Sequence, residues 1–531
     1  MFGRPASSTF GKRFRCSSSK TTVVTVVFAS ALLLLSLPSP SVTASPLRIS
    51  TTQTTLTLTL QTAAEESSAS SEEKNTASQE SAPGTETEGE EHLGVILPAW
   101  TVLPFAGLLL CIAILPLKAP HWFEKNKNRA IVAAAFGLPV ILYLLAFHGE
   151  EGLHHILHTG EEYVSFIVLL AALYTISGGI YVTGNILGTP GTNLAFLVVG
   201  AVLANFIGTT GAAMVLIRPL LRANSERKHT RHIFIFFIFI VCNCGGLLTP
   251  LGDPPLFLGF LRGIDFFWTP KHLIPEWILA NGLIMAVFLV MDNHYIKKEA
   301  RAAVKADVAD YVPIGIAGKI NFLYLAGVIG AVLASKPLLA AGEKIHFPFL
   351  REVVMVVMIL LSLKAAPEGP RKANHFTWNA IQEVAILFAG IFAAMIPALA
   401  ILKARGGELG LTEPWHFFWT TGTLSSFLDN APTYLTFLST AQGYLHIPEA
   451  AGMMSTAVTA VGRSPAQFLE AISAGAVFMG ANSYIGNAPN FMVKSICEES
   501  GIKMPSFFGY MAWAAVVLIP IFVLTTFIFF R

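Results

Sequence analysis

The sequence predicts an all-α polytopic membrane protein with about ten transmembrane helices and two re-entrant hairpins, arranged as two repeats of inverted topology. Three observations support this fold class. Of the 531 residues, 53% are hydrophobic and only 13% are charged, whereas soluble domains carry about 25% charged residues. Apolar stretches long enough to cross a bilayer recur from residue 93 to the C-terminus. One ten-residue pattern occurs twice, in the middle of two such stretches.

The repeated pattern has the form G-x-x-[T/S]-x-x-G-[D/N]-x-P and spans residues 246–255 and 480–489. Inside a helix each glycine costs about 1 kcal/mol and a proline about 3 kcal/mol, so the backbone should unwind there. Irregular backbone at membrane depth is tolerated only where protein or a water-filled cavity satisfies it, which makes each break a candidate binding site. The residues expected to break the helices are Gly246, Gly252, Pro254, Pro255, Gly480, Gly486 and Pro489.

The first 92 residues precede the predicted membrane region. Residues 1–44 combine a basic start, an apolar core and a small-x-small site, which is typical of a cleavable signal peptide. An uncleaved anchor helix and an organelle transit peptide are the alternatives. Residues 45–92 are rich in Ser, Thr and Glu and nearly free of aromatic residues. Because such a segment cannot bury enough surface to fold, it is predicted to be a disordered, acidic, extracytoplasmic tail.

Lys and Arg concentrate in cytoplasmic loops, so the basic loops predict the orientation of each span. In the acidic, His-bearing stretch at 150–162 a solvated loop is expected; a metal site is the alternative, although the histidines follow no set ligand spacing. The apolar stretch at 190–221 is predicted to form a hairpin because the basic residues near it place both of its ends in the cytoplasm. The first repeat, residues 93–313, is predicted to contain spans at 93–117, 130–147, 163–183 and 270–291, a hairpin at 190–221 and a broken span at 233–262.

The second repeat, residues 314–531, has the same order of elements with the opposite orientation. Its hairpin tip at 426–432 aligns with the first tip at 205–211 as [N/S]-F-[I/L]-[G/D]-[T/N]. This layout is expected of a secondary transporter, here in a bacterial inner membrane with the tail and the C-terminus outside the cytoplasm. The predicted elements are spans at 319–339, 350–363, 378–402 and 506–530, a hairpin at 415–444 and a broken span at 467–497.

Inverted repeats would bring four interrupted helices together near the bilayer midplane. Helix N-termini there favour anions, and unwound carbonyl groups favour cations. Hydroxyl and amide groups suit either a hard cation such as Na⁺ or a carboxylate substrate, so these groups leave both open. The candidate ion-binding or substrate-binding residues are Asn205, Thr209, Thr210, Thr249 and Asp253 in the first repeat and Ser426, Asp429, Asn430, Ser483 and Asn487 in the second.

Two carboxylates favour cation and proton exchange. Asp253 and Asp429 are predicted to lie at membrane depth, where an ionisable group marks a functional site. Desolvation favours a protonated carboxyl group, so a proton and a cation can compete for its oxygen atoms. We therefore expect a Na⁺ (or Li⁺)/H⁺ antiporter with a sodium site at Asp253, Asp429 and Asn430, and with no cofactor besides the transported ions. The structural alternatives are an Asx turn at Asp253 and a helix N-cap at Asp429.

The second functional hypothesis is a citrate or other organic-anion transporter coupled to protons or sodium. An enzyme is not expected, since the spans contain no His-Glu metal motif, GxSxG elbow or paired catalytic carboxylates. The net charge of +2 predicts no nucleic-acid partner, which leaves membrane lipid and the transported solute. Charges near predicted span ends are expected to snorkel to the membrane surface, namely Glu276, Asp292, Lys336, Glu352 and Lys364.

These motifs resemble the ion transporter superfamily, which groups NhaD-type sodium/proton antiporters, arsenite permeases, citrate transporters and dicarboxylate/sodium symporters. The resemblance spans about residues 93–531 and is carried by residues 208–220, 243–255 and 428–433. Asp429-Asn430-x-Pro432 is similar to the hairpin of the antiporter branch, which implies a cation-coupled proton site there. Dicarboxylate symporters carry Ser-Asn-Thr at both tips, a signature absent here. The resemblance further implies an elevator-like motion and a homodimer.

Overall fold

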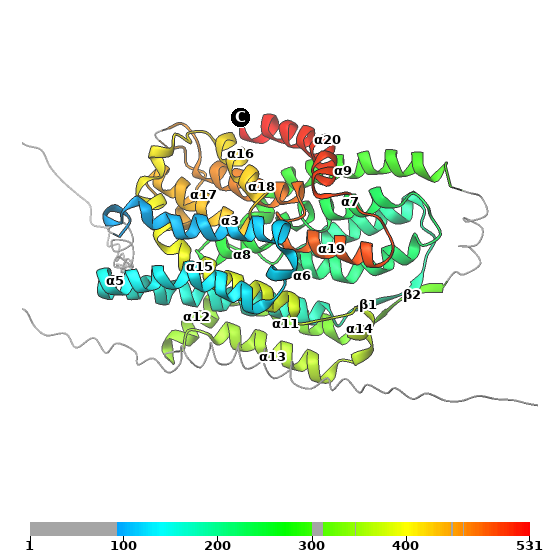
Figure 1. Cartoon of the computed structure of the whole chain (residues 1–531), viewed down its shortest axis with the longest axis horizontal. Helices are drawn as coiled ribbons and strands as arrows, with labels where there is room; N and C mark the ends of the chain where they lie inside the picture. Colours follow the sequence, from blue (N-terminus) through cyan, green and yellow to red (C-terminus); the bar gives the residue numbers. More distant parts are fainter. Residues whose placement is uncertain (1–92, 300–311, 346, 448–449, 460) are drawn as a thin grey trace, which may run out of the picture. The chain divides into compact units, whose positions relative to one another are not determined.

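The computed structural model describes residues 93–531 except 300–311, 346, 448–449 and 460. The predicted signal peptide (1–44) and acidic tail (45–92) therefore lie outside the described residues. The described residues belong to one compact unit, and they form helices almost throughout (Figure 1). The all-α membrane class is confirmed.

The first part of the chain forms helices up to residue 296 that follow the predicted order. Several helices end at or directly before a charged residue or glycine: α3 at Lys118, and α5, α8 and α9 before Gly178, Arg262 and Lys297. The elements are η1 (Ala99–Val102), α3 (Leu103–Lys118), α4 (Pro120–Phe123), α5 (Asn126–Ser177), α6 (Pro190–Ala223), α7 (Arg231–Ile240), η2 (Cys244–Leu248), α8 (Pro254–Leu261) and α9 (Trp268–Ile296).

The remainder of the chain is likewise helical. Proline opens α16 and α18 at the first helical position, where its missing N–H costs nothing. The elements are α11 (Ile320–Leu333), α12 (Ser335–Lys344), α13 (Leu350–Ala365), α14 (Glu368–Ala373), α15 (Asn379–Arg405), η3 (Gly406–Leu409), α16 (Pro414–Ser425), α17 (Asn430–Leu445), η4 (Ala450–Met454), α18 (Pro465–Met479), η5 (Gly480–Asn482), α19 (Ala488–Glu499), α20 (Phe507–Thr525) and η6 (Thr526–Phe530).

Helix α5 corrects the prediction of a solvated loop at 150–162. The chain is helical from Asn126 to Ser177, and its one non-helical residue is Gly149, with φ 50° and ψ −120°. Glycine reaches this conformation without a steric penalty, so the chain bends there and resumes a helix at once. Glu162, inside the supposed loop, is buried and forms an ion pair with Arg262 at 3.0 Å. Helix-forming Glu and Leu residues and this ion pair explain the difference.

Helix α6 confirms the first hairpin. Its one non-helical residue is Gly208, with φ 76° and ψ 156°. Asn193 and Asn224 would be about 46 Å apart in a straight helix, yet they exchange side-chain hydrogen bonds of 3.1 and 2.8 Å. The two asparagines therefore lie side by side at the base of a hairpin whose tip is Gly208. Asp292 of α9 holds this base, because it accepts a hydrogen bond from Asn193 at 2.9 Å and pairs with Arg227 at 2.5 Å.

The described residues contain seven helices that are long and apolar enough to cross a membrane, or eight if one bent pair counts as a span. About ten spans were predicted. The numbers differ because α5 runs through two predicted spans, because α13 and the helices of the second break are short, and because the seven include α6, which was predicted as a hairpin. The bent pair is α11 and α12, which meet at an angle of 69° within the predicted span 319–339.

Two short strands were not predicted. The strand β1 (Tyr181–Asn185) pairs antiparallel with β2 (Val312–Ala317), with Tyr181 opposite Ala317 (Figure 1). The predicted boundary between the repeats, after residue 313, lies inside β2. The ribbon therefore joins the end of α5 to the start of α11.

The interior is formed around the interrupted helices. Residues 233–240 of α7 are wholly buried, as expected of a helix that is hydrophobic on all sides. The long helices α5 and α15 pack against each other, and α5 also packs against α13 and α6. The two breaks, η2 and η5, thus lie among protein groups that can satisfy their unwound backbone.

Candidate functional site

Both repeated motifs interrupt a helix, as predicted. After α7 the chain forms the short helix η2, becomes extended at Asp253 and restarts as α8 at Pro254. After α18 it forms η5, becomes extended at Asn487 and restarts as α19 at Ala488. Asp253 and Asn487 hold the N-cap positions of these second helices, but neither side chain caps its own helix. Both side chains are thus free to contact other elements, and the Asx-cap alternative for Asp253 is wrong.

The spacing of glycines that the two motifs share has a steric reason. A Cβ atom on Gly252 would lie 2.1 Å from the carbonyl oxygen of Gly246. A Cβ atom on Gly486 would lie 2.6 Å from the carbonyl oxygen of Gly480. Such separations are far below van der Waals contact, so each break closes on itself only when the second glycine has no side chain.

In the first half of the membrane region, hydrogen bonds join the hairpin tip to the helix break at η2. Asn205 donates to the carbonyl of Gly245 at 2.7 Å, and its side-chain oxygen accepts from the amide of Leu248 at 2.8 Å. The hydroxyl of Thr249 donates to the carbonyl of Asn205 at 2.5 Å. The amide of Thr209 donates to the carbonyl of Gly252 at 2.9 Å. These bonds satisfy the unwound backbone and fix Thr209 beside Asp253.

The second half has matching contacts. Ser426, the counterpart of Asn205, donates to the carbonyl of Met479 at 3.1 Å, just as Asn205 donates to Gly245. Met479 and Gly245 each precede the first glycine of their motif. The hydroxyl of Ser483, the counterpart of Thr249, donates to the carbonyl of Ser426. Asn205 and Ser426, aligned by the hairpin tips, and Thr249 and Ser483, aligned by the ten-residue pattern, thus form matching hydrogen bonds.

The two halves meet at Asp253, which is 1% exposed. One carboxylate oxygen accepts from the hydroxyl of Thr209 at 3.0 Å and from the amide of Asn487 at 3.0 Å. The other oxygen accepts from the side-chain amide of Asn430. Asn487 also donates to the carbonyl of Cys242 at 3.0 Å. Four predicted residues from α6, α17 and the two motifs thus form one buried cluster, the Asp253 cluster, of Thr209, Asp253, Asn430 and Asn487.

Asp429 lies at the edge of this cluster. Its carboxylate accepts from the amide of Ala431 at 3.1 Å and caps α17, so the capping alternative is confirmed. The side chain is only partly buried, and Asp429 directly precedes Asn430 of the cluster. A capping carboxylate retains lone pairs for another ligand. Thr210 is also partly buried, and in the described part of the chain no side-chain hydrogen bond joins it to the Asp253 cluster.

The predicted site residues omitted an amide pair that joins the two breaks. Asn243 donates to the side-chain oxygen of Asn490 at 2.8 Å, and Asn490 donates to the carbonyls of Gly480 and Ser483, both at 2.9 Å. Both side chains are completely buried. The sequence signal that could have identified this pair was an asparagine immediately after Pro489 and another asparagine three residues before Gly246. A buried side-chain amide needs hydrogen-bond partners, so each was a candidate for a contact.

The charges of the site are all acidic. In the described part of the chain, neither Asp253 nor Asp429 forms an ion pair with Lys, Arg or His. The described residues also contain no group of three or more His, Cys, Asp or Glu side chains suited to a metal ion. One neutral acceptor is unused: the side-chain oxygen of Asn430 is buried and has no hydrogen-bond partner among the described residues.

Three carboxylates expected to snorkel are instead buried. Glu276, Asp292 and Glu352 are 2%, 0% and 4% exposed. Glu352 pairs with Arg351 at 2.5 Å and accepts from Ser165 at 2.7 Å. The expectation was wrong because these residues face neighbouring helices rather than the membrane surface. The direction in which a side chain points cannot be derived from the distance of its residue to the end of a span. Lys336 and Lys364 are exposed, as expected.

A comparison with protein families gives one match. A family model described as "Putative citrate transport" matches residues 94–530, which covers every helix named above. No curated protein sequence matches the chain.

Proposed function

This chain belongs to the family described as "Putative citrate transport", and we propose that it exchanges Na⁺ or Li⁺ for protons at the Asp253 cluster. One observation carries the proposal: the centre of the site is a buried carboxylate, 1% exposed, whose hydrogen-bond partners Thr209, Asn430 and Asn487 are all neutral. An isolated buried charge is costly, so the carboxylate needs a proton or a cation.

The oxygen atoms of the cluster fit a small hard cation. The carboxylate of Asp253 and the hydroxyl of Thr209 are hydrogen-bonded to each other. Asn430 donates a hydrogen bond to the other carboxylate oxygen, and its own side-chain oxygen is unused. Carboxylate, amide and hydroxyl oxygens are the ligands that hard cations prefer. A bound cation or a bound proton would each neutralise Asp253, so the two occupants exclude one another. This mutual exclusion is what antiport requires.

A second candidate is citrate or another organic anion, which the description of the matching family favours. Such a substrate would need positive charge or many N–H donors at the site. The N-terminus of α19 could supply the amide N–H of Ala488, whereas α8 begins with Pro254 and Pro255, which have no N–H to donate. We rank this candidate second because Asp253 in the cluster and Asp429 at its edge are carboxylates, which repel an anion when ionised.

The matching contacts of Asn205 and Ser426, and of Thr249 and Ser483, support the proposal that the halves are repeats. The basic loops support inverted orientation, with the N-terminal tail outside the cytoplasm. A single reporter cysteine near Gly84, in protein whose native cysteines are replaced, is expected to react with a membrane-impermeant thiol reagent on intact cells. Reaction only after permeabilisation would refute the orientation.

The function is tested in inverted membrane vesicles that carry a pH-sensitive dye. After respiration has acidified the vesicles, adding NaCl or LiCl is expected to release protons from the lumen, whereas KCl and citrate are expected to give no release beyond that of vesicles lacking the protein. Uptake of labelled citrate, together with no response to any cation, would instead establish the second candidate.

A further inference from the structure

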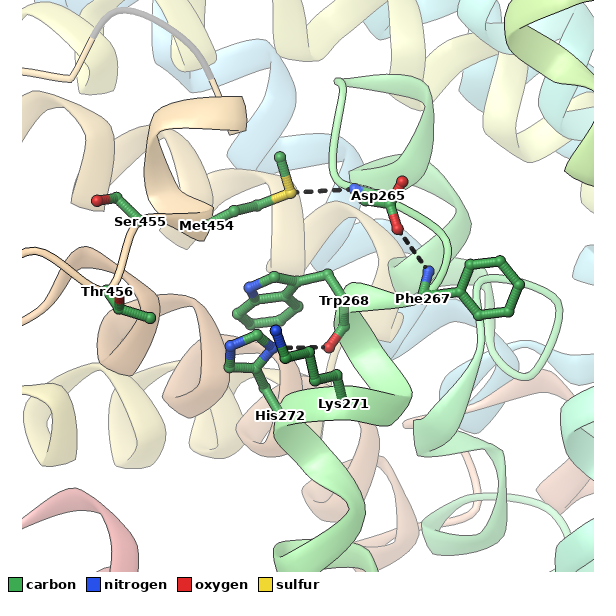
Figure 2. Close-up of a pocket in the computed structure, with 8 residues that line it drawn as sticks. All are labelled: Asp265, Phe267, Trp268, Lys271, His272, Met454, Ser455 and Thr456. Carbon is green, nitrogen blue, oxygen red and sulfur yellow. Dashed lines mark hydrogen bonds between the residues drawn. The ribbon is translucent and has the colours of Figure 1, made fainter.

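A pocket lies between the start of α9 and the segment that follows η4. It has a volume of about 440 Å³ and is lined on the α9 side by Trp268, Lys271 and His272 and on the opposite side by Thr456 (Figure 2). The remaining lining residues are Asp265, Phe267, Met454 and Ser455. In the part of the chain that the structure describes, no hydrogen bond joins the lining residues to the Asp253 cluster. The pocket is therefore a separate site.

Trp268 brings a buried hydrogen-bond donor to this pocket. The residue is 5% exposed, and its indole Nε1 atom has no hydrogen-bond partner among the described residues. Figure 2 shows this nitrogen on the edge of the ring that is turned toward the 454–456 segment. An indole N–H group can only donate, and a buried donor without an acceptor costs free energy. Because Lys271 and Met454, which line the pocket with it, have flexible unbranched side chains, a ligand can reach the nitrogen without a movement of the backbone.

His272 holds the indole ring in place. The two rings stack, with their centroids 4.6 Å apart and their planes at 18°. The Nδ1 atom of His272 also lies 2.9 Å from the carbonyl oxygen of Trp268. A carbonyl group only accepts, so this nitrogen carries a proton and donates it. The direction of the indole N–H is thus set before any ligand binds, which lowers the entropy cost of binding.

Lys271 gives the pocket a positive charge close to the indole. It follows Trp268 by three residues, so both side chains lie on the same side of α9. Lys271 is exposed and forms no ion pair among the residues that the structure describes. Thr456 adds an exposed hydroxyl group from the opposite side. The pocket therefore offers an ammonium group, an indole N–H and a hydroxyl to a ligand that accepts hydrogen bonds.

One acidic side chain also lines the pocket. The carboxylate of Asp265 accepts a hydrogen bond from the amide of Phe267 at 2.9 Å and lies on the Phe267 side of the pocket (Figure 2). Asp265 is exposed, so water and salt screen its charge. Its repulsion of an anion is therefore weaker than the direct contact that Lys271 and the indole can make.

The basic loops predict that both sides of the pocket face away from the cytoplasm. On one side, the predicted broken span at 233–262 leaves the cytoplasm and the span at 270–291 returns to it. On the other, the 454–456 segment lies between the hairpin at 415–444, whose ends are predicted outside, and the broken span at 467–497. The two predictions come from different halves of the chain and agree.

We propose that this pocket is an extracytoplasmic binding site for a small oxyanion, which accepts a hydrogen bond from the indole of Trp268 and pairs with Lys271. Dissolved carboxylates and phosphates share this chemistry with the phosphate of a lipid head group. Since α9 belongs to the first half of the membrane region and the 454–456 segment to the second, the bound oxyanion connects the two halves. The proposal does not depend on cation exchange at the Asp253 cluster.

Binding of a dissolved oxyanion is tested by isothermal titration calorimetry on the purified full-length protein in a neutral detergent, with citrate and inorganic phosphate as probes. At least one probe is expected to bind the wild type. Lys271→Gln should weaken this binding by about ten-fold or more, because it removes a charge-assisted contact. Trp268→Phe, which keeps an aromatic ring but removes the N–H group, should weaken it several-fold. Lys336→Gln, which replaces an exposed lysine of α12 outside the pocket, is the control and should leave it unchanged.

Binding of a probe that Lys271→Gln does not weaken would place the anion elsewhere and overturn the proposal. If neither probe binds, native mass spectrometry of protein incubated with phosphatidylglycerol tests the lipid head group. The wild type and Lys336→Gln should then retain this lipid, and Lys271→Gln should lose most of it. Equal retention by all three proteins would also overturn the proposal. Neither measurement requires transport, so a failure of cation/proton exchange leaves both results decisive.

Discussion

Replacing Asp253 with Asn is expected to abolish cation-driven proton movement. The variant removes the charge that binds a cation and the carboxyl group that binds a proton. It also places a side-chain NH₂ group opposite donors from Thr209, Asn430 or Asn487. A buried donor left unpaired costs about 1–3 kcal/mol, so the melting temperature should fall as well. Transport is measured in proteoliposomes, and melting is measured on detergent-solubilised protein.

The chain offers a matched control for this prediction. Asn487 is the counterpart of Asp253 and donates to it at 3.0 Å. The exchange variant Asp253→Asn/Asn487→Asp keeps one carboxylate and one amide in the cluster, so it is expected to recover part of the lost stability. A folded Asp253→Asn protein that transports at the wild-type rate would show that Asp253 is not the exchange site.

Replacing Gly252 with Ala is expected to have a comparably large effect through the backbone. The new Cβ atom would lie 2.1 Å from the carbonyl oxygen of Gly246 and 3.1 Å from the side-chain oxygen of Asn205. Overpacking in a rigid core typically costs about 1–3 kcal/mol, and a clash with backbone cannot be relieved by turning a side chain. We expect little folded protein in detergent, and no transport by what remains, because the adjacent Asp253 must move.

The comparison variants separate this clash from a general effect of adding a methyl group. Gly486→Ala should be similarly damaging, since its Cβ atom would lie 2.6 Å from the carbonyl oxygen of Gly480. Gly282→Ala, within α9, has no atom within 4 Å of the new methyl group and should leave folding and transport unchanged. Wild-type yield and melting temperature for Gly252→Ala would contradict the account of the break.

The sequence predicted the features that depend on local backbone preference. The breaks at 246–255 and 480–489 and the turn at Gly208 follow from glycine and proline, whose effects act on their own segment. Asp253 was identified because a carboxylate within an apolar stretch is exceptional. Asn205 and Ser426, which the hairpin tips align, each donate to the carbonyl group that precedes the first glycine of a motif.

Features that depend on contacts between distant segments were not predicted. The bond between Asn243 and Asn490 joins residues 247 positions apart, and no spacing rule relates them. The β1–β2 ribbon pairs two segments whose local pattern is not distinctive. The burial of Glu276, Asp292 and Glu352 depends on which neighbouring helix each one faces. Helix continuation beyond Gly149 was missed because polar residues suggested solvent, although they also form helices well.

The most direct test of the central claim uses purified protein in proteoliposomes that enclose a pH-sensitive dye. An inward Na⁺ or Li⁺ gradient, imposed without a membrane potential, is expected to drive protons outward in wild-type vesicles and to drive none in vesicles with Asp253→Asn. Accumulation of labelled citrate by the wild type, with no movement of protons in response to either cation, would contradict exchange at the Asp253 cluster.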